Sequence, residues 1–473
     1  MLIDMTKGSE TKHIIVFAVP MFIGNIFQQL YNMVDAIVVG KFIGKDALAS
    51  VGTSFPIMFF LVAMVMGLSM GASVIISQLY GAGHYKKVKH AVSTTFMFLL
   101  ICAVVITIAG LLASRGLLKL LQTPEEIIND AATYLKIIFS GIIFMFVYNT
   151  ISAILRGLGD SKTPLYFLII ASLLNIGLDI LFVTAFKMGV EGVAWATIIS
   201  QAVSATLCII YVYAKVELLK IQPEDMIFDK DLFIKSVKLG IPASIQQTVV
   251  SVSMMALQGL VNSYGVITIA AYTAASKIDS IAMMPIMNLG LATSTFTAQN
   301  IGAGEIGRVR RGYRRSLAMV TICCIITSAV ILLFRSNLMS IFIDSKDIEV
   351  IAQGNDYITV VSFFYILMGL MFVTNGVIRG SGDMTVSMVS TVASLGTRII
   401  AAYILSSVST IGYKGIWWSI PIGWTLGAFI AMFRYRSGKW VEKRVVKTSE
   451  KVGFEKCNSE ETDYKKTVED SYT

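Results

Sequence analysis

The sequence predicts an all-α integral membrane protein in which twelve transmembrane helices form two six-helix bundles related by a parallel repeat. The first observation is composition: of 473 residues, 55% are apolar and only 15% are charged. These charged side chains are too few to cover a soluble protein of this size, so much of the surface must face lipid. The second observation is a set of twelve long apolar segments, and the third is that the second half of the chain repeats the first.

Metal, disulfide and nucleotide sites need residue spacings that this sequence lacks. Four of the five cysteines lie inside apolar segments, and no two form a CxxC pair. The three histidines, His13, His84 and His90, do not have the spacing of a metal site. The chain also has no GxxxxGK[ST] loop. We therefore expect no cofactor, no ATP hydrolysis by this chain and no enzymatic activity.

The apolar segments each approach or exceed the roughly 20 residues that a helix needs to cross a bilayer. We place the spans at about 13–40, 46–79, 90–114, 127–155, 163–186, 190–214, 233–263, 268–300, 311–334, 349–378, 384–408 and 415–435. The first is not expected to be a cleaved signal peptide, because it lacks a small-residue cleavage site. The predicted parts are N-terminal residues 1–12, a bundle at 13–214, a linker at 215–232, a second bundle at 233–436 and a disordered tail at 437–473.

Basic residues predict the orientation of the spans. Loops on the side of the N-terminus carry about 18 Lys and Arg residues, including Lys86, Lys87, Lys89 and a run at 308–315, against about eight on the other side. Because basic loops stay in the cytoplasm, both termini and the 215–232 linker are expected there, with the protein in the inner (plasma) membrane. These loops and the net charge of +9 indicate contact with anionic lipid rather than nucleic acid, since no aromatic-studded groove accompanies them.

The chain repeats itself at an offset of roughly 222 positions. Four matches occur in the same order: 19–20 with 241–242, 78–83 with 299–304, 154–160 with 377–383, and 192–195 with 415–418. In the third match, ILRGLGD recurs as VIRGSGD. Each half holds an even number of spans, so both halves enter the membrane in the same sense. Two such bundles facing each other across a central cleft would suit alternating access.

Two acidic residues are predicted at membrane depth, where an ionised carboxylate is costly unless it has a partner. Asp35 lies about five residues, roughly 8 Å, below the outer end of the first span, and Asp179 about seven residues, roughly 10 Å, below that of the fifth. Asn175 is four residues before Asp179 and so on the same helix face. Thr197 of the sixth span and Tyr134 of the fourth come to the same level. We expect these side chains to converge in the outer half of the N-terminal bundle.

A cluster of this composition can capture a cation reversibly. Burial disfavours the charged form of a carboxyl group, and two neighbouring acids cannot both ionise cheaply, so one holds a proton until water returns. Hard oxygen ligands also suit Na⁺, which Asp35, Asn175, Asp179 and Thr197 could bind. The alternative is a polar network that only joins helices, which is disfavoured because neither acid has a basic partner at its depth. Pro20 could bend the first helix, either as a passive kink or as a moving hinge.

The C-terminal half carries Lys277 and Asp279 in the eighth span, about ten residues from its outer end. Residues at i and i+2 do not face each other on a helix, so each is expected to have its partner elsewhere. Two roles remain open at this point. One is an ion pair that stabilises the bundle, and the other is a polar site for substrate binding or coupling.

Several motifs taken together resemble the multidrug and toxic compound extrusion (MATE) family. They are QLYGAG at 78–83, QNIGAG at 299–304, LRGLGD at 155–160 and VEGVAW at 190–195. The resemblance covers about 13–435, nearly everything except the tail. It implies a cation-coupled antiporter that exports organic cations while H⁺ or Na⁺ flows inward.

The resemblance also implies roles for individual residues. The family's first-helix acid and helix-bending proline fall on Asp35 and Pro20. Its fifth-helix asparagine and aspartate, sixth-helix threonine, fourth-helix tyrosine and fourth-helix asparagine fall on Asn175, Asp179, Thr197, Tyr134 and Asn149. Except for Pro20 and for Asn149, which the span boundaries put deeper, these are the residues that the depth argument brings together.

Another branch of the family has a glutamate in the seventh helix and an aspartate in the tenth. Gln246 and Gln247 stand at the first position here, and residues 357–377 contain no acid at the second. Ion coupling is therefore expected in the N-terminal bundle. Gln246 and Gln247 join Lys277 and Asp279 as a candidate polar site of the C-terminal bundle.

The expected function is secondary active multidrug efflux of cationic amphipathic small molecules, driven by inward H⁺ or Na⁺ and carried out by a monomer. The sequence does not distinguish the two ions. A flippase for lipid-linked sugars is an alternative of related fold, but it would need a cationic cleft for pyrophosphate rather than an acid pair. A channel or a non-transporting membrane protein is the other alternative, and uphill, saturable export would exclude it.

Overall fold

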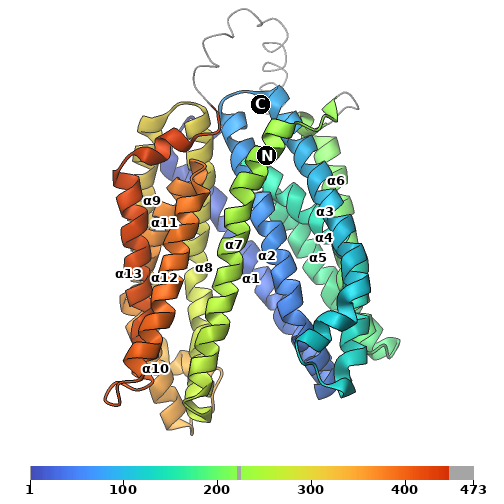
Figure 1. Cartoon of the computed structure of the whole chain (residues 1–473), viewed down its shortest axis with the longest axis vertical. Coiled ribbons are helices and arrows are strands. Elements are labelled where there is room, and N and C mark those ends of the chain that lie inside the picture. Colours follow the sequence, from blue (N-terminus) through green and yellow to red (C-terminus); the bar gives the residue numbers. More distant parts are fainter. Residues whose placement is uncertain (1, 221–224, 447–473) are drawn as a thin grey trace, which may run out of the picture. The chain divides into compact units, whose positions relative to one another are not determined.

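The computed structural model describes residues 2–220 and 225–446. The described chain is built of long helices joined by short turns (Figure 1). In the first half these are α1 (Glu10–Val38), α2 (Lys45–Gly81), α3 (Tyr85–Leu120), α4 (Glu125–Gly157), α5 (Lys162–Ile180) and α6 (Val190–Lys215). In the second half they are α7 (Lys230–Asn262), α8 (Val266–Gly302), α9 (Ile306–Ser340), α10 (Ile348–Phe363), α11 (Tyr365–Gly380), α12 (Met384–Ser406) and α13 (Lys414–Arg436).

Each predicted span coincides with one of these helices, or with the pair α10 and α11. Within residues 2–220 and 225–446, ten helices are long and apolar enough to cross a membrane, or eleven spans if α10 and α11 are counted together as one. The remaining helix, α7, has 33 residues and is long enough, but Gln246, Gln247 and other polar residues lower its hydropathy. The predicted all-α membrane fold is therefore confirmed.

The tenth span is broken, which the sequence did not predict. Its two helices meet at Phe364 with a bend of 49°, although neither proline nor glycine stands at the break. Two side chains of α9 donate hydrogen bonds to carbonyl groups beside it: Ser328 Oγ to Ser362 O at 2.7 Å and Cys324 Sγ to Tyr365 O at 3.3 Å. Backbone groups freed by a break inside a membrane need such partners, so the break is held by its neighbours.

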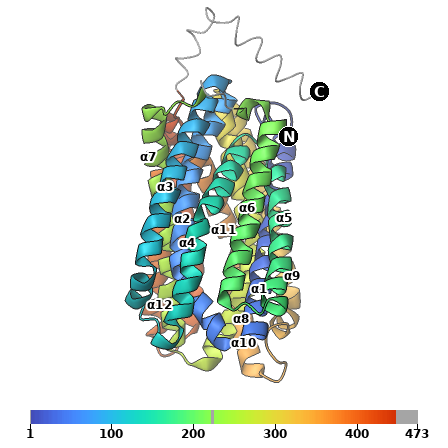
Figure 2. The same ribbon diagram turned by 90° about the vertical axis from the view of Figure 1, so that its right-hand side faces the viewer.

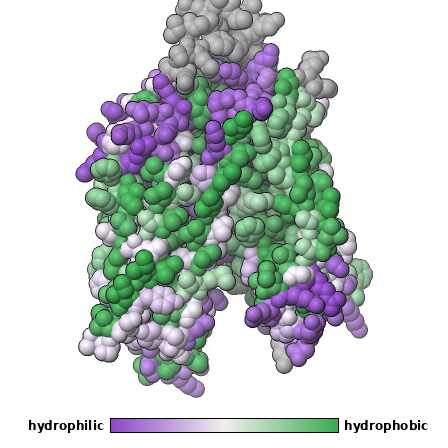
Figure 3. Space-filling model, in the orientation of Figure 1, coloured by the Kyte–Doolittle hydropathy of each residue, from purple (hydrophilic) through white to green (hydrophobic). Residues whose placement is uncertain are grey.

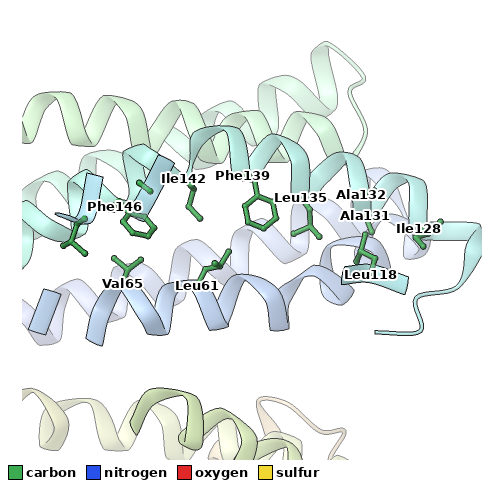
Figure 4. Close-up of a cluster of buried hydrophobic side chains, with 12 residues drawn as sticks. Leu61, Val65, Leu118, Ile128, Ala131, Ala132, Leu135, Phe139, Ile142 and Phe146 are labelled. Atoms are coloured by element: carbon green, nitrogen blue, oxygen red, sulfur yellow. The ribbon is translucent and has the colours of Figure 1, made fainter. Parts of the chain in front are cut away.

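The helices of the first half cross closely where small residues replace bulky ones. A Cβ atom on Gly110 of α3 would lie 2.1 Å from the Phe139 ring of α4, so only glycine admits this aromatic side chain. Phe139 belongs to a buried cluster drawn from α2, α3 and α4 (Figure 4). Gly141 of α4 meets Ile198 of α6 in the same way, and α6 also packs along α5 (Figure 2). Close packing of this kind holds membrane helices together, because lipid provides no hydrophobic drive between them.

The chain divides into two compact units whose limits differ from the predicted bundles. Unit 1 contains residues 2–3 and Ile23–Gly240, and unit 2 contains Asp4–Phe22 and Ile241–Val446. Both divisions fall inside a helix, α1 and α7, rather than in the predicted linker at 215–232. The reason is that the start of each helix is bound elsewhere: Glu10 of α1 pairs with Arg311 of α9 at 3.0 Å, and the Phe233 ring of α7 packs on the Phe98 ring of α3.

The predicted disordered tail begins too early at 437. Residues Lys439–Lys443 form a short 3₁₀ helix, and Trp440 is buried with its ring stacked on Tyr435. The indole Nε1 donates to the Tyr435 carbonyl at 3.0 Å. An aromatic anchor thus fixes the chain after α13, and residues 447–473 lie outside the described residues.

Apolar side chains cover the middle of the helices, and hydrophilic ones gather near their ends (Figure 3). Leu112, Leu333 and Phe433 are 84%, 77% and 69% exposed. Exposed apolar surface of this extent is the surface of a membrane protein facing lipid.

Candidate functional site

Asp35 and Asp179 occupy equivalent places in their helices. Asp35 lies near the end of α1 and Asp179 near the end of α5, and each helix continues into a π-helical turn, Val39–Ile43 and Leu181–Ala185. The two π-helical turns contact each other. Gly44 ends the first turn at φ 123°, a conformation that favours glycine. Irregular turns of this kind are frequent at functional sites, and here they bring two helix ends together.

The two carboxyl groups meet in a space with few hydrogen-bond donors. Asp179 is fully buried and Asn175 is 1% exposed, whereas Asp35 is half-buried. The side chains of Asp35 and Asp179 interact directly with each other. Among the described residues, no donor hydrogen-bonds to Asp35 Oδ1 or to either carboxylate oxygen of Asp179, and both amide atoms of Asn175 also lack partners. Buried polar atoms are nearly always paired, so this group of unpaired oxygens points to a ligand.

Two phenols complete the cluster. Tyr134 of α4 is 8% exposed, and its phenol lies within electrostatic reach of both acids. Tyr31 of α1 lies within reach of them as well, and it interacts with Thr197 of α6. The structure thus brings together the five side chains expected from the depth argument. Their roles remain predictions.

Sequence reasoning missed Tyr31. It stands four residues before Asp35, just as Asn175 stands four residues before Asp179. Both pairs therefore have the i, i+4 spacing that places side chains on one helix face. This spacing, applied to the first helix as it was to the fifth, would have identified Tyr31.

Asn149 and Pro20 lie away from the cluster. Asn149 is on the same helix as Tyr134 but fifteen residues further along, or about 22 Å at the rise of an α-helix. Its Nδ2 donates to Met145 O of its own helix at 2.8 Å. Pro20 is fifteen residues before Asp35, again about 22 Å, and α1 is helical on both sides of it. Neither residue can contact the ion at the acid pair directly.

The cluster has the chemistry of a reversible site for a small hard cation. Two carboxyl groups in contact interact favourably only when a proton or a metal cation lies between them. No basic side chain in the described chain forms an ion pair with either acid. Carboxylate, amide and hydroxyl oxygens are the ligands that H⁺ or Na⁺ would need at this place.

Asp279 in unit 2 has a different environment. Tyr365 OH donates to Asp279 Oδ1 at 2.7 Å, and Tyr357 OH donates to Oδ2 at 3.1 Å. Arg398 of α12 lies within electrostatic reach. Both of its oxygens accept hydrogen bonds, so Asp279 joins α8 to α10 and α11.

The other candidates of unit 2 do not gather around Asp279. Lys277 is exposed, with its ammonium 5.6 Å from the centre of the Phe342 ring. Gln246 Nε2 donates to Thr391 Oγ1 of α12 at 2.7 Å. Gln247 follows it in α7, and its backbone carbonyl accepts from Ser251 Oγ at 3.3 Å. The side chains of Asp279, Lys277 and Gln246 therefore have separate partners, and these three do not form a single cluster.

A family model described as MatE matches this chain twice, at residues 20–181 and 242–404. The chain belongs to the MatE family. The two matches begin at Pro20 and Pro242, which is the offset of the internal repeat, so each half of the chain is one MatE unit. The protein is accordingly a membrane transporter and not an enzyme.

Relatives in the MatE family cover nearly the whole chain. The probable multidrug resistance protein YpnP of Bacillus subtilis is 34% identical over 438 residues, covering 92% of this chain and 97% of that protein. YoeA of the same organism, also named a probable multidrug resistance protein, is 32% identical over 452 residues, covering 93% and 96%. The probable multidrug resistance protein NorM of Thermotoga maritima is 28% identical over 456 residues, covering 93% and 95%.

Solved MATE structures share the fold. One is described as the outward-facing conformation of a multidrug resistance MATE family transporter of the MOP superfamily. It has a TM-score of 0.87 and 26% identity, covering 93% of this chain and 99% of that one. A crystal structure of MATE in complex with MaL6 also has a TM-score of 0.87, with 25% identity over 93% and 99% of the two chains. The predicted arrangement of twelve spans in two repeated halves is confirmed by this likeness.

Proposed function

We propose that this chain exports small amphipathic organic cations from the cell in exchange for inward H⁺ or Na⁺. The observation that carries the proposal is the interaction of the half-buried Asp35 with the fully buried Asp179, without a basic partner among the described residues. The relatives named multidrug resistance proteins support the efflux of drugs. The family resemblance supports the exchange for an ion.

Charge repulsion between the two acids provides the coupling. Two like charges about 4 Å apart repel by about 4 kcal/mol where the effective dielectric constant is about 20. An H⁺ or Na⁺ between Asp35 and Asp179 removes that repulsion, and the oxygens of Asn175 and Thr197 complete its surroundings. Release of the ion restores the repulsion, so the ion-bound and ion-free clusters favour different packings of α1 and α5. Alternating access requires a difference of this kind.

The driving force is sufficient for useful export. One ion that enters down a membrane potential of 100 mV supplies about 2.3 kcal/mol, to which its concentration gradient adds. This free energy corresponds to roughly fifty-fold accumulation of an uncharged substrate. When one ion is exchanged for one monovalent organic cation, no net charge crosses the membrane, so the concentration gradient of the ion drives the export, and a second ion per cycle adds the potential. No substrate binding by the acid pair is needed for the exchange, since the ion and the substrate can bind in different parts of the protein.

We further propose that the transporter lies in the inner (plasma) membrane with both termini in the cytoplasm, as a monomer. The basic residues at the start of α9, from Arg308 to Arg315, support this orientation. Arg310, Arg314 and Arg315 among them are exposed and support contact with anionic lipid. A cytoplasmic N-terminus puts the C-terminal end of α1, and therefore Asp35, towards the outside. External ions then reach the acid pair first, which is the direction that antiport needs.

The test is gradient-driven export of a fluorescent organic cation by the purified protein in proteoliposomes. An imposed H⁺ gradient and an imposed Na⁺ gradient are applied separately, which identifies the coupling ion. Asp35→Asn and Asp179→Asn should each reduce export at least tenfold, because a neutral amide cannot exchange the ion. Asp130→Asn is the matched control, since Asp130 is exposed on α4. Wild-type export by both Asp35→Asn and Asp179→Asn would reject the proposal. A downhill ion current that does not saturate, in place of export by the wild-type protein, would indicate a channel.

A further inference from the structure

Residues Met5–Gly8, which we call the N-terminal strap, are bound by unit 2. The backbone N–H of Met5 donates to Gln299 Oε1 at 2.9 Å. Its carbonyl accepts from Asn300 Nδ2 at 3.2 Å, and its side chain is fully buried. Gln299 and Asn300 lie at the end of α8, within the QNIGAG motif. A short segment ahead of the first helix is thus bound through its backbone, almost 300 positions away in the sequence.

One arginine holds most of the strap. Arg308, 7% exposed, donates from Nε to Met5 O at 3.1 Å, from Nη2 to Lys7 O at 2.9 Å and from Nη1 to Gly8 O at 2.8 Å. Its guanidinium also lies 5.5 Å from the centre of the Phe296 ring. The planar fork of an arginine is suited to several acceptors at once. Lysine, with a single ammonium group, cannot reproduce this geometry.

The strap leads directly into the helix that carries Asp35. Glu10, the first residue of α1, pairs with Arg308 at 3.5 Å and with Arg311 at 3.0 Å. From there α1 continues without interruption to Val38. Residues up to Phe22 belong to unit 2, and those from Ile23 belong to unit 1. Arg308 therefore fixes one end of a continuous helix whose other end carries an acid of the candidate ion site.

A matching arrangement precedes α7. Lys89 of α3 pairs with Asp225 at 2.9 Å. Thr94 Oγ1 accepts from Asp229 N at 2.9 Å and donates to Ile227 O at 3.3 Å. This segment belongs to unit 1, whereas α7 passes into unit 2 after Gly240. Asp4-Met5 recurs as Asp225-Met226 in the sequence, so a bound entry segment is a feature of both repeats.

We propose that Arg308 is a positioning residue for ion coupling. By clamping the strap it gives α1 a fixed cytoplasmic anchor, against which a change of charge at Asp35 can move the rest of the helix. Without the anchor, α1 responds to the ion but transmits less of that response to unit 2. The ion then crosses without export of the substrate. This inference rests on the proposed function, because it presupposes that ion and substrate fluxes are coupled.

The experiment compares Arg308→Ala with the wild-type protein in proteoliposomes, full-length in both cases. The flux of the coupling ion and the export of a fluorescent organic cation are measured in the same vesicles. Arg308→Ala should raise the number of ions moved per exported dye molecule about fivefold or more. A change of this size corresponds to the loss of a typical coupling free energy between two sites. Arg315→Ala is the matched control, since Arg315 is an exposed arginine of the same helix and should leave the ratio unchanged.

Amide hydrogen exchange tests whether a change in the ion-to-dye ratio accompanies release of the N-terminal strap. Amides of residues 4–10 should exchange faster in Arg308→Ala, while those of α2 and α4 keep their protection. If Arg308 has a purely structural role, its replacement lowers the melting temperature and leaves the ion-to-dye ratio of the folded protein at the wild-type value. An unchanged ion-to-dye ratio in Arg308→Ala overturns the proposal. If the alanine variant does not fold, Arg308→Lys is measured instead, since it keeps the charge and loses the fork, and the same two outcomes decide.

The failure of this proposal can be told apart from failure of the proposed function. If the wild-type protein shows no ion-driven export, the proposed function fails, whatever Arg308 does. If the wild-type protein is coupled and Arg308→Ala is equally coupled, only the positioning role is wrong.

Discussion

The acidic residues of this chain differ in what surrounds them. Asp160 accepts hydrogen bonds from the backbone N–H groups of Lys162 and Thr163, both at 3.0 Å, at the start of α5. Its counterpart in the repeat, Asp383, is paired with Arg434. In the described chain, neither carboxylate oxygen of Asp179 nor Oδ1 of Asp35 has such a donor. Acids with full sets of partners stabilise a fold, whereas a pair without donors is available to a ligand.

Tyr31→Phe should weaken the response to the coupling ion. The phenol lies within electrostatic reach of both acids and interacts with Thr197, and loss of one neutral hydrogen bond costs about 0.5–1.5 kcal/mol. The ion concentration for half-maximal export should rise about two- to tenfold. Tyr166→Phe is the control, because Tyr166 is an exposed tyrosine of α5. An unchanged ion dependence of Tyr31→Phe would remove Tyr31 from the site.

Asp383→Asn should destabilise the protein through a buried charge. Asp383 Oδ2 accepts from Arg434 Nε at 2.7 Å and Nη2 at 2.6 Å, and the Asp383 side chain is 4% exposed. Removing one partner of such a pair costs up to about 3–5 kcal/mol, because the half-buried Arg434 keeps its charge without a counter-ion. Asp231→Asn, in the exposed pair with Lys235, should cost at most about 1 kcal/mol. Thermal unfolding in detergent measures the stability of both variants. Equal melting temperatures of Asp383→Asn and Asp231→Asn would show that the pair of Asp383 with Arg434 does not stabilise the fold more than the exposed pair does.

At the scale of elements, the break in the tenth span depends on its neighbours. Asp279 of α8 accepts from Tyr357 of α10 and from Tyr365 of α11. One carboxylate therefore joins both arms of the broken span to a third helix. Ser328 of α9 satisfies a carbonyl at the break itself. The bend is consequently held in place by hydrogen bonds with α8 and α9 within unit 2.

Asp279→Asn should reduce stability and spare the coupling. The amide can keep at most one of the two phenols as a donor to its oxygen, which costs about 1–3 kcal/mol. The ion-to-dye ratio should stay at the wild-type value, since the ion site is proposed in unit 1. Detergent melting and vesicle transport are measured on the same preparation. If the folded variant loses ion-driven export, Asp279 takes part in coupling after all.

A close helix crossing in unit 1 depends on glycine. Gly67 and Gly71 of α2 form a GxxxG motif that meets Gly240 of α7. A Cβ atom on Gly71 would lie 2.6 Å from Gly240 N and 2.7 Å from Ser236 O. These are backbone atoms, which cannot move aside as a flexible side chain can. The small-residue face thus lets two helix backbones come into contact.

Gly71→Ala should therefore destabilise unit 1 by about 1–3 kcal/mol, the usual cost of overpacking. Gly116→Ala on α3 is the control, since no atom lies within 4 Å of its Cβ position. Folded yield and melting temperature in detergent compare the two. A wild-type melting temperature for Gly71→Ala would show that the crossing relaxes easily.

At the scale of the whole molecule, much of the architecture could be predicted from the sequence. The spans, the repeat and the shared level of Asp35 and Asp179 all follow from local patterns: hydropathy, offset and helical rise. Other features leave no such pattern. The break at Phe364 lacks a proline or glycine, and the strap is bound by Arg308 about 300 positions away. Contacts of one side chain with distant backbone carbonyls have no periodicity that a sequence could reveal.

The orientation is testable with single cysteines and a membrane-impermeant maleimide on intact cells. Lys187→Cys and Ser345→Cys should react from outside, because both follow helices that run outward from the basic side. Lys86→Cys should react only after the cells are opened. All three positions are exposed in the structure. The reverse pattern of labelling would invert the proposed direction of ion entry.

The division of α1 and α7 between the two units has a consequence for a chain that is produced as two pieces. A piece ending at residue 220 would keep Asp35 and Asp179 but lose the 225–240 stretch that unit 1 contains. The complementary piece would lose residues 4–22 in the same manner. Each half of the chain therefore contributes a helical segment to the unit formed by the other half, as subunits do in domain swapping. We expect the two pieces to form a working transporter only when both are produced together, because each piece lacks residues that its own unit needs.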